Sequence, residues 1–387
     1  MDAFTTPLPK AWQKVRLGDI AEIKRGASPR PIENPKWFCA NSNVGWVRIS
    51  DISKNSRFLY KTAQKLSKKG IEKSRFVKQN SLIMSMCATI GKPIITKIDT
   101  CIHDGFVVFE NPRIDLNYLY YFLCYIEKEW LESGQQGSQV NLNVDLIKNK
   151  EVFCPKDLNE QIAIANVLSD VDRYLYSLDA LILKKESVKK ALSFELLSQR
   201  KRLKGFNQAW QRVRLGDIAE IKRGVRITKN ELDVFGKYPV VSGGVGFLGY
   251  TNNFNRHENT ITIAQYGTAG YVNFQKNKFW ANDVCFCIYP NKDIIKNIFL
   301  YYFLKVNQNY LYEISNRNAT PYSISKDKIL DFEILLPPLN EQRAIANILS
   351  ALDSEIISLK NKKRQFDNIK KALNHDLMSA KIRVLKK

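Results

Sequence analysis

The stretch WQKVRLGDIAEIKRG, residues 12–26, occurs a second time as WQRVRLGDIAEIKRG, residues 210–224. Only one letter differs between the two copies. A second stretch, LNEQIAIANVLSDVD at 158–172, returns with most of its letters unchanged as LNEQRAIANILSALD at 339–353. Self-similarity of this length indicates that the chain is two copies of one unit.

Each copy carries an insert between its two repeated stretches, residues 27–157 in the first and 225–338 in the second. The inserts share little sequence. In the frame, exposed charged residues such as Asp19 and Lys24 recur along with the apolar ones, which core packing alone would not require. A constant frame with two divergent inserts predicts one scaffold that presents two different binding modules.

The composition indicates a folded protein that binds a polyanion. The chain has 387 residues, enough for two to four domains, and 44% of them are hydrophobic. Lys and Arg number 60 against 38 acidic residues, a net charge of +22. Such an excess favours nucleic acid, with an anionic membrane surface as the alternative. We expect double-stranded DNA as a partner and no membrane.

Localisation and metal content follow from what the sequence lacks. It has no apolar run long enough to cross a bilayer, and its first residues, MDAFTTPLPKA, do not resemble a signal peptide. We therefore expect a cytoplasmic protein. The seven cysteines form no CxxC pair and the three histidines lie far apart, which predicts reduced thiols and no metal site.

The inserts have the pattern of α/β modules. The first frame stretch predicts a strand that enters a short helix or turn, closed by Gly26. In the first insert we expect strands within 44–53, 80–91, 92–98 and 104–112, then a helix over 116–133 and a polar glycine loop over 134–143. In the second we expect strands within 236–244, 259–274 and 283–290, a helix over 295–314 and a polar loop over 315–325.

Each module is followed by a long helical pattern that begins just after a proline, at Pro155 and at Pro338. Both helices should be about 40 residues and about 60 Å long. Their apolar residues step by three and four, as in a coiled coil, so we expect the two helices to pack antiparallel. To this stripe we assign contacts with partner proteins, at Leu168, Val171, Leu175, Leu178, Leu349, Leu352, Ile356 and Leu359. Lys185 and Lys363 interrupt the stripe.

The expected domain order is a first recognition module (1–157), a first spacer helix (158–205), a second module (206–338) and a second spacer helix (339–387). Joining the two chain ends would recreate the internal junction at 197–210, so the arrangement is cyclic with a pseudo-two-fold axis. Because duplex DNA also has local two-fold symmetry, two unlike modules on a rigid spacer suit two unlike half-sites.

Motifs for catalysis are absent from the sequence. We find no GxGxxG, no GxxxxGK[ST] and no [ND]PP[YF] tetrapeptide, and Pro337–Pro338 lies in LLPPL without the flanking residues of such a motif. Glu22–Lys24 and Glu220–Lys222 match the ExK of a nuclease half-site, but an upstream metal-binding Asp is missing and the stretch looks helical. We expect no catalytic residue in this chain.

The repeated W-x-x-V-x-L-G-D-I opening, the helix start Leu158-Asn159-Glu160-Gln161 with its copy from Leu339, and the exit LLSQRKRLKGF resemble the DNA specificity subunit of type I restriction-modification systems. The resemblance covers nearly the whole chain. It implies a non-catalytic subunit whose two target recognition domains each bind half of a bipartite, asymmetric DNA sequence, with coiled-coil helices that set the spacing.

The same resemblance implies the partners. Two modification subunits would dock on the helices, bind S-adenosylmethionine and methylate adenine at N6, and restriction subunits would supply an ATP-driven translocase and a nuclease that use Mg²⁺. This chain itself would need no cofactor. Two alternatives stay open on the residues alone: a free-standing nuclease or methyltransferase with cryptic motifs, and a structural scaffold that does not read sequence.

Candidate DNA-contacting residues are polar, cationic or aromatic side chains in the loops of the inserts. The alternative for each is an ordinary polar turn, or, for the aromatic residues, the core. In the first module they are Arg30, Trp46, Arg48, Ser85, Thr89, Lys92, Gln136, Ser138, Gln139 and Asn141. In the second they are Tyr250, Asn252, Asn253, Gln265, Tyr266, Thr268, Asn316, Arg317 and Thr320.

Overall fold

The computed structural model describes residues 9–133, 142–318 and 320–384. The chain forms two compact units, Met1–Ser177 together with Lys363–Lys387, and Leu178–Lys362. Each of the two long helices belongs to the first unit at one end and to the second at the other. Among the described residues, no helix has the length and apolar character needed to cross a bilayer.

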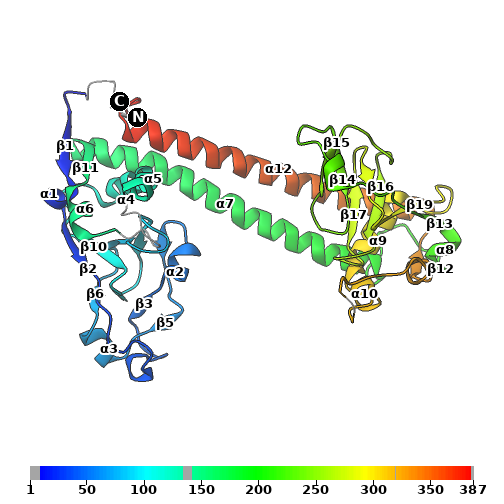
Figure 1. Ribbon diagram of the computed structural model, residues 1–387, viewed down its shortest axis with the longest axis horizontal. Coiled ribbons are helices and arrows are strands. Elements are labelled where there is room, and N and C mark those ends of the chain that lie inside the picture. Colours follow the sequence, from blue (N-terminus) through cyan, green and yellow to red (C-terminus); the bar gives the residue numbers. More distant parts are fainter. Residues whose placement is uncertain (1–8, 134–141, 319, 385–387) are drawn as a thin grey trace. The chain divides into compact units, whose positions relative to one another are not determined.

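The first unit is an α/β module (Figure 1). Its strands are β1 (Trp12–Arg16), β2 (Glu22–Arg25), β3 (Gly45–Val47), β4 (Phe58–Leu59), β5 (Gln64–Lys65), β6 (Arg75–Val77), β7 (Leu82–Ser85), β8 (Pro93–Thr96), β9 (Thr100–Ile102), β10 (Phe106–Glu110) and β11 (Glu151–Pro155). Its helices are α1 (Leu17–Ile20), η1 (Pro35–Trp37), α2 (Ile49–Ser53), α3 (Lys68–Glu72), α4 (Leu116–Tyr125), α5 (Glu127–Ser133), α6 (Val144–Asn149) and the start of α7 (Leu158–Leu197).

These strands form three sheets, ordered β1-β11, β2-β10-β7-β8-β4 and β5-β3-β9-β6. Most neighbours are antiparallel, whereas β3 runs parallel to β9 and β4 parallel to β8. Helix α4 contributes a run of buried aromatic and aliphatic residues, among them Tyr118 and Phe122, to the main core. Leu377 and Met378, from the end of the second long helix, belong to the same core.

The second unit repeats this plan. Its strands are β12 (Gln211–Arg214), β13 (Ala219–Arg223), β14 (Tyr238–Val241), β15 (Gly249–Thr251), β16 (Thr260–Ala264), β17 (Val272–Gln275), β18 (Trp280–Ala281), β19 (Cys285–Pro290) and β20 (Glu333–Leu336). Its helices are α8 (Leu215–Ile218), η2 (Lys229–Glu231), α9 (Asn297–Val306), α10 (Gln308–Glu313), α11 (Lys326–Leu330) and the start of α12 (Leu339–Met378). The sheets are ordered β12-β20, β13-β19-β16-β17 and β15-β14-β18.

The long helices are each 40 residues, as predicted. In the first unit the start of α7 lies against the end of α12, where Asp172 forms an ion pair with Lys370 at 2.5 Å. In the second unit the end of α7 lies against the start of α12, where Lys185 pairs with Glu355 at 2.7 Å. Within each unit the two helices are therefore antiparallel, which confirms the predicted fold class. Lys185, which interrupts the apolar stripe, therefore forms an ion pair between the two helices.

Four elements differ from the prediction. Residues 22–24, which looked helical, form strand β2, because they pair with β10 from Glu22↔Glu110 to Arg25↔Val107. Residues 49–53, expected within a strand, form helix α2, whose Asp51 carboxylate accepts a hydrogen bond from the Arg48 N–H at 2.9 Å. The helices predicted over 116–133 and 295–314 are each split in two, at Ile126 and at Asn307.

The first turn of each long helix is attached to its module by one glutamine. Gln342 is fully buried; its Oε1 accepts from the Lys296 N–H at 2.7 Å, and its Nε2 donates to the Pro337 carbonyl at 2.8 Å. Gln161 is bonded in the same way in the first unit, to the Asp115 N–H and the Pro155 carbonyl, both at 2.8 Å. The N-E-Q triplet therefore connects helix and module.

Candidate nucleic-acid interface

In the first unit three of the predicted DNA contacts meet around one surface hollow of about 440 Å³. Arg30 follows β2, whereas Trp46 and Arg48 lie on and just after β3. The parallel pairing of β3 with β9 places them beside the segment that follows β9. The hollow is lined by Ser28, Arg30, Ile32, Trp46, Arg48, Ile49, Ser50, His103 and Asp104.

His103 lines this hollow as a neutral imidazole. Burial lowers its pKa to about 4; the carboxylate of Asp104 opposes this shift, and the guanidinium of Arg48 adds to it. Its Nδ1 accepts a hydrogen bond from the Gly105 N–H at 2.9 Å. In the neutral ring the proton is therefore on Nε2, which makes that atom a hydrogen-bond donor.

Asp104 positions the rim of the hollow. Its carboxylate accepts a hydrogen bond from the Ser28 hydroxyl at 2.8 Å and forms an ion pair with Arg30 at 3.2 Å. Its backbone carbonyl accepts from the Arg25 Nε at 2.8 Å. The guanidinium of Arg48 is exposed and has no hydrogen-bond or ion-pair partner among the described residues. His103 and Asp104 were missed by the sequence reasoning; their only signal was a short polar segment between two apolar strands.

Trp46 and Ser85 have no exposed surface, so neither side chain is available at the protein surface. The Trp46 ring lies under the hollow, 5.9 Å from the His103 ring, and its Nε1 has no hydrogen-bond partner among the described residues. Ser85 instead holds its own loop together by bonding to the Thr89 carbonyl and the Lys92 N–H.

The remaining predicted contacts of the first module fall into two groups. Thr89 and Lys92 are half-buried on the loop after β7. Gln136, Ser138, Gln139 and Asn141 lie outside the described residues.

In the second unit two loops that carry predicted residues meet each other, and one of them also contacts the loop at Gly243. Thr268 donates to the Gly243 carbonyl at 2.7 Å. Asn316 and Ser323 exchange backbone hydrogen bonds at 2.7 and 3.1 Å, and Tyr266 forms a further β-bridge with Ser323. The neighbouring Gln265 is half-buried, and its Oε1 is buried with no partner among the described residues.

Arg317 and Thr320 are exposed on the last of these loops. The Arg317 guanidinium lies 5.2 Å from the ring centres of both Tyr312 and Tyr322, and its Nε donates to the Tyr312 carbonyl at 3.0 Å. These contacts orient the arginine while leaving it open to solvent.

Tyr250, Asn252 and Asn253 are exposed at and after strand β15. Asn252 donates to the Asp233 carboxylate at 2.5 Å. The same region exposes large apolar side chains that the sequence reasoning missed, above all Val234 at 90% and Phe235 at 93%. Two adjacent apolar residues in the polar setting N-E-L-D-V-F-G-K were the available signal.

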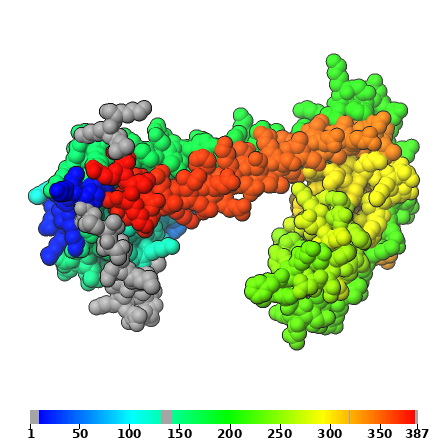
Figure 2. Space-filling model, turned by 90° about the horizontal axis from the view of Figure 1, so that it is seen from above, coloured from blue at the N-terminus to red at the C-terminus, as the bar shows by residue number. Residues whose placement is uncertain are grey.

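Most of the eight leucine, isoleucine and valine positions assigned to partner contacts are buried inside the chain. Leu168, Leu175, Leu178, Leu349 and Ile356 are buried, and Val171, Leu352 and Leu359 are half-buried. The physical reason is that the apolar stripe of a coiled-coil helix is covered by the helix that it packs against. The apolar side chains that the two long helices leave exposed are Leu158, Ile162, Val167, Tyr176, Leu181, Leu183, Val188, Phe194, Ile357 and Ile369. On the face drawn in Figure 2, α12 forms part of the molecular surface.

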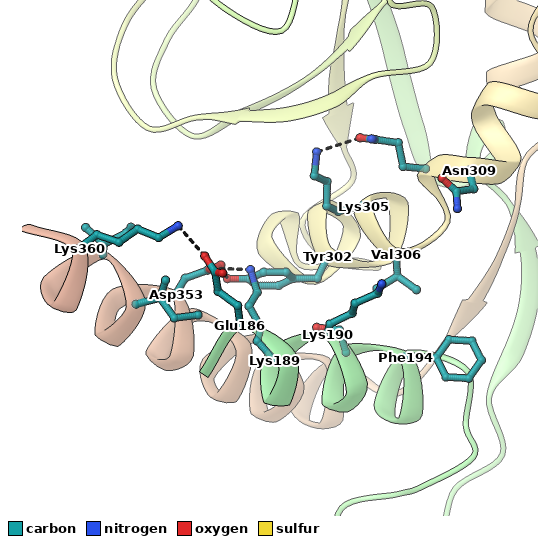
Figure 3. A pocket seen from close by; sticks show the side chains of 14 residues that line it. Glu186, Lys189, Lys190, Phe194, Tyr302, Lys305, Val306, Asn309, Asp353 and Lys360 are labelled. Atoms are coloured by element: carbon teal, nitrogen blue, oxygen red, sulfur yellow. Dashed lines mark hydrogen bonds and ion pairs between the residues drawn. The ribbon is translucent and has the colours of Figure 1, made fainter. Parts of the chain in front are cut away.

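A groove of about 720 Å³ follows the helix pair within the second unit (Figure 3). Its charged groups are largely paired. Lys189 forms an ion pair with Asp353, and Lys360 pairs with Glu186 at 2.6 Å. Lys305, whose pKa burial lowers with help from Lys189, donates to the Val272 carbonyl at 2.8 Å. The two ion pairs join α7 to α12, and the Lys305 bond lies within the module. Among the described residues no group of three His, Cys, Asp or Glu could hold a metal ion.

One tyrosine–aspartate hydrogen bond recurs in the two units. Tyr121 donates to Asp172 at 2.6 Å in the first unit. Tyr302 donates to Asp353 at 2.7 Å in the second. The ExK residue Lys24 is bound to Glu110 at 2.5 Å and to Glu22 at 3.0 Å, so its ammonium is engaged in the frame.

Comparison with known proteins gives a consistent result. The family model described as "Type I restriction modification DNA specificity domain" matches residues 9–185 and 207–366. The chain is similar to the type I restriction enzyme EcoprrI specificity subunit of Escherichia coli, with 23% identity over 87% of this chain and 86% of that protein. It is 26% identical to the putative type I restriction enzyme MjaX specificity subunit of Methanocaldococcus jannaschii, over 97% of this chain and 95% of that protein.

The fold is also similar to solved structures. The S subunit of a type I restriction-modification system from M. genitalium has a TM-score of 0.69 at 18% identity, covering 97% of this chain and 98% of that one. A chain from a study of complex assembly and conformational transition of the type I system has a TM-score of 0.61 at 16% identity, covering 96% and 99%. The family match spans most of the chain, in two copies, and the resemblance seen in the sequence is confirmed: this chain belongs to the type I restriction-modification DNA specificity family.

Proposed function

We propose that this chain reads a bipartite, asymmetric DNA sequence, the first unit binding one half and the second unit the other. The observation that supports this is that one frame carries two different surfaces. An added Cβ on Gly26 would lie 2.0 Å from the His103 carbonyl oxygen, and one on Gly224 would lie 2.0 Å from that of Asn282. Asn282 therefore occupies the place of His103.

The strand registers extend this correspondence to the residues after β3 and β14. Val47 pairs with Ile102, the residue before His103. Val241 pairs with Ala281, the residue before Asn282. Ser242 therefore stands where the first unit has Arg48. Asn282 donates to the Ser242 hydroxyl at 3.3 Å, so the two polar groups satisfy each other. The first unit therefore presents a cation and a neutral imidazole where the second unit has a hydroxyl and an amide. Groups of such different chemistry suit different base sequences.

The proposed contact set is the predicted set without Trp46 and Ser85, whose side chains are buried. In the first unit they are Arg30, Arg48, Thr89 and Lys92, together with Gln136, Ser138, Gln139 and Asn141. In the second they are Tyr250, Asn252, Asn253, Gln265, Tyr266, Thr268, Asn316, Arg317 and Thr320. The net charge of +22 would supply the sequence-independent attraction to phosphates.

The chemistry would come from partners. Two modification subunits carrying S-adenosylmethionine would methylate adenine at N6, and restriction subunits would use ATP and Mg²⁺ to translocate and cut. This chain would direct them without catalysing a step. The exposed apolar side chains of α7 and α12 support docking on these helices, because exposed large apolar side chains gain free energy when a partner covers them.

Methylation mapping tests the proposal. A host without its own adenine methylation would express this chain with its modification subunit, and a control host would express the modification subunit alone. We expect methylated adenine at one bipartite motif only when this chain is present. Exchange of residues 27–157 for those of a relative should change one half of the motif. An assembled complex that methylates without any motif would show that the units do not read sequence, and would favour the scaffold alternative.

A further inference from the structure

The hollow of the first unit is lined by hydrogen-bond donors that the protein itself does not use. The Trp46 Nε1–H can only donate, is fully buried and has no partner among the described residues. The neutral His103 ring uses Nδ1 as acceptor for Gly105, which leaves the Nε2–H as a donor. Arg48 carries five N–H groups, and its guanidinium has no partner among the described residues.

A buried donor without a partner costs free energy, so such a group in a folded protein requires an explanation. Trp46 meets that description, but its ring has no exposed surface, so the donors that can reach a ligand are those of His103 and Arg48. Because Arg30 is already paired with Asp104 at 3.2 Å, Arg48 is the cation that remains for a ligand. The hollow is therefore complementary to a ligand edge that presents acceptors.

The hollow also contains one acceptor. The Asp104 carboxylate binds Ser28 and Arg30, and its two oxygens offer about four lone-pair sites in all, so further acceptor capacity remains. In the major groove, guanine presents two acceptors, O6 and N7, and its paired cytosine presents the N4 amino donor. A phosphate presents acceptors only, and it would leave the remaining acceptor sites of Asp104 unused.

We propose that this hollow reads one G·C base pair in the half-site of the first unit, with Arg48 donating to the guanine edge and Asp104 accepting from cytosine. This inference rests on the proposed function of the first unit as a DNA reader. The second unit, with Ser242 and Asn282 at the corresponding places, lacks this combination and reads its half-site by other contacts.

The test uses the complex of this chain with its modification subunit. Binding would be measured on duplexes that carry the mapped motif and every single-base change in it, at several salt concentrations. For Arg48→Ala we expect discrimination at one G·C position of one half-site to fall roughly ten- to a hundredfold. The other half-site should be unaffected. Arg48→Gln should shift preference at the same position toward adenine, which glutamine can contact through two hydrogen bonds.

Arg113→Ala is the matched control, because this exposed arginine follows the opposite end of β10 from Asp104 and its loss removes the same charge. Uniform weakening by Arg48→Ala on all duplexes, with the salt dependence reduced by about one ion, would show a phosphate contact and overturn the proposal. Unchanged binding and specificity would overturn it as well. Since Arg48 is exposed, an unfolding midpoint equal to that of the wild type should confirm that the variant is folded.

These outcomes are separate from those of the proposed function. If the wild-type complex itself shows no motif, the reader function fails before any variant is considered. If the wild type has a motif and Arg48→Ala keeps it, only the G·C assignment fails.

Discussion

Arg383, five residues after the end of α12, donates two hydrogen bonds to Glu160 in the first turn of α7, at 3.0 and 2.8 Å. In the second unit Arg202, five residues after α7, binds Glu341 in the first turn of α12 at 3.1 and 2.6 Å. The segment after α12 and the segment after α7 therefore make the same ion pair, once in each unit, as the predicted equivalence of the two segments requires.

Loss of the Arg383 side chain should destabilise the first unit more than loss of the negative charge of Glu160. Arg383→Ala leaves the carboxylate of Glu160, which is only 8% exposed, with Trp12 Nε1 at 3.3 Å as its remaining donor. Glu160→Gln leaves an arginine that can turn to water. We expect the thermal midpoint to fall by several degrees in Arg383→Ala and to recover in part when Glu160→Gln is added. Equal losses in the two single variants would contradict this explanation.

Gln342→Leu should lower the free energy of unfolding by roughly 2–4 kcal/mol, because it leaves a buried N–H and a buried carbonyl without partners. Denaturant titration measures this change. Asn347→Leu, at an exposed position of the same helix, is the control and should stay within about 0.5 kcal/mol of the wild type. A small effect of Gln342→Leu would mean that water replaces the lost hydrogen bonds.

Gly26→Ala should destabilise the first unit by more than about 2 kcal/mol, since the new methyl would lie 2.0 Å from the His103 carbonyl oxygen and the backbone must move. Gly246→Ala is the comparison, because an added Cβ there meets no atom within 4 Å. Urea unfolding of both variants checks the difference. Similar midpoints for the two variants would show that β2 can shift without cost.

Stability should depend on pH through His103. The unfolded chain takes up a proton at this residue near pH 6.5, whereas burial keeps the folded residue neutral down to about 4. Below pH 6.5 the unfolded state therefore binds more protons, and the free energy of unfolding falls as pH drops toward 4, by at most about 3 kcal/mol.

His103→Asn, which copies Asn282 of the second unit, should remove this part of the pH dependence. Unfolding free energies of wild type and variant at pH 7.5 and 4.5 give the comparison. Asp104 and Arg48, the charged groups that act on His103, are retained in both proteins. An identical pH dependence in the two would mean that His103 titrates normally in the folded state.

Leu183→Glu should weaken assembly with the modification subunit by tenfold or more, because Leu183 is 64% exposed on α7 and a charge there would be desolvated on docking. Titration calorimetry with the purified modification subunit measures the effect. Ser187→Glu adds the same charge one helical turn later, at a polar exposed position, and should bind more nearly like the wild type. Normal binding by Leu183→Glu would place the docking surface elsewhere.

The sequence by itself determined the repeat, the fold class, the two 40-residue helices and the family, because these depend on periodicity and identity among residues close together in the chain. It also placed Arg30 and Arg48 in the candidate set. It misjudged residues 22–24 and 49–53, whose conformation depends on pairing with β10 and on the Asp51 cap.

Only the tertiary structure decided which candidates are accessible. The parallel pairing of β3 with β9 joins residues more than 50 positions apart, which buries Trp46 and places His103 beside Arg48. The apolar stripe of α7 and α12 is buried for the same kind of reason, since each helix covers the other within its unit. Burial, and the pKa shift that it causes at His103, depends on neighbours brought in from distant segments, which local sequence patterns do not encode.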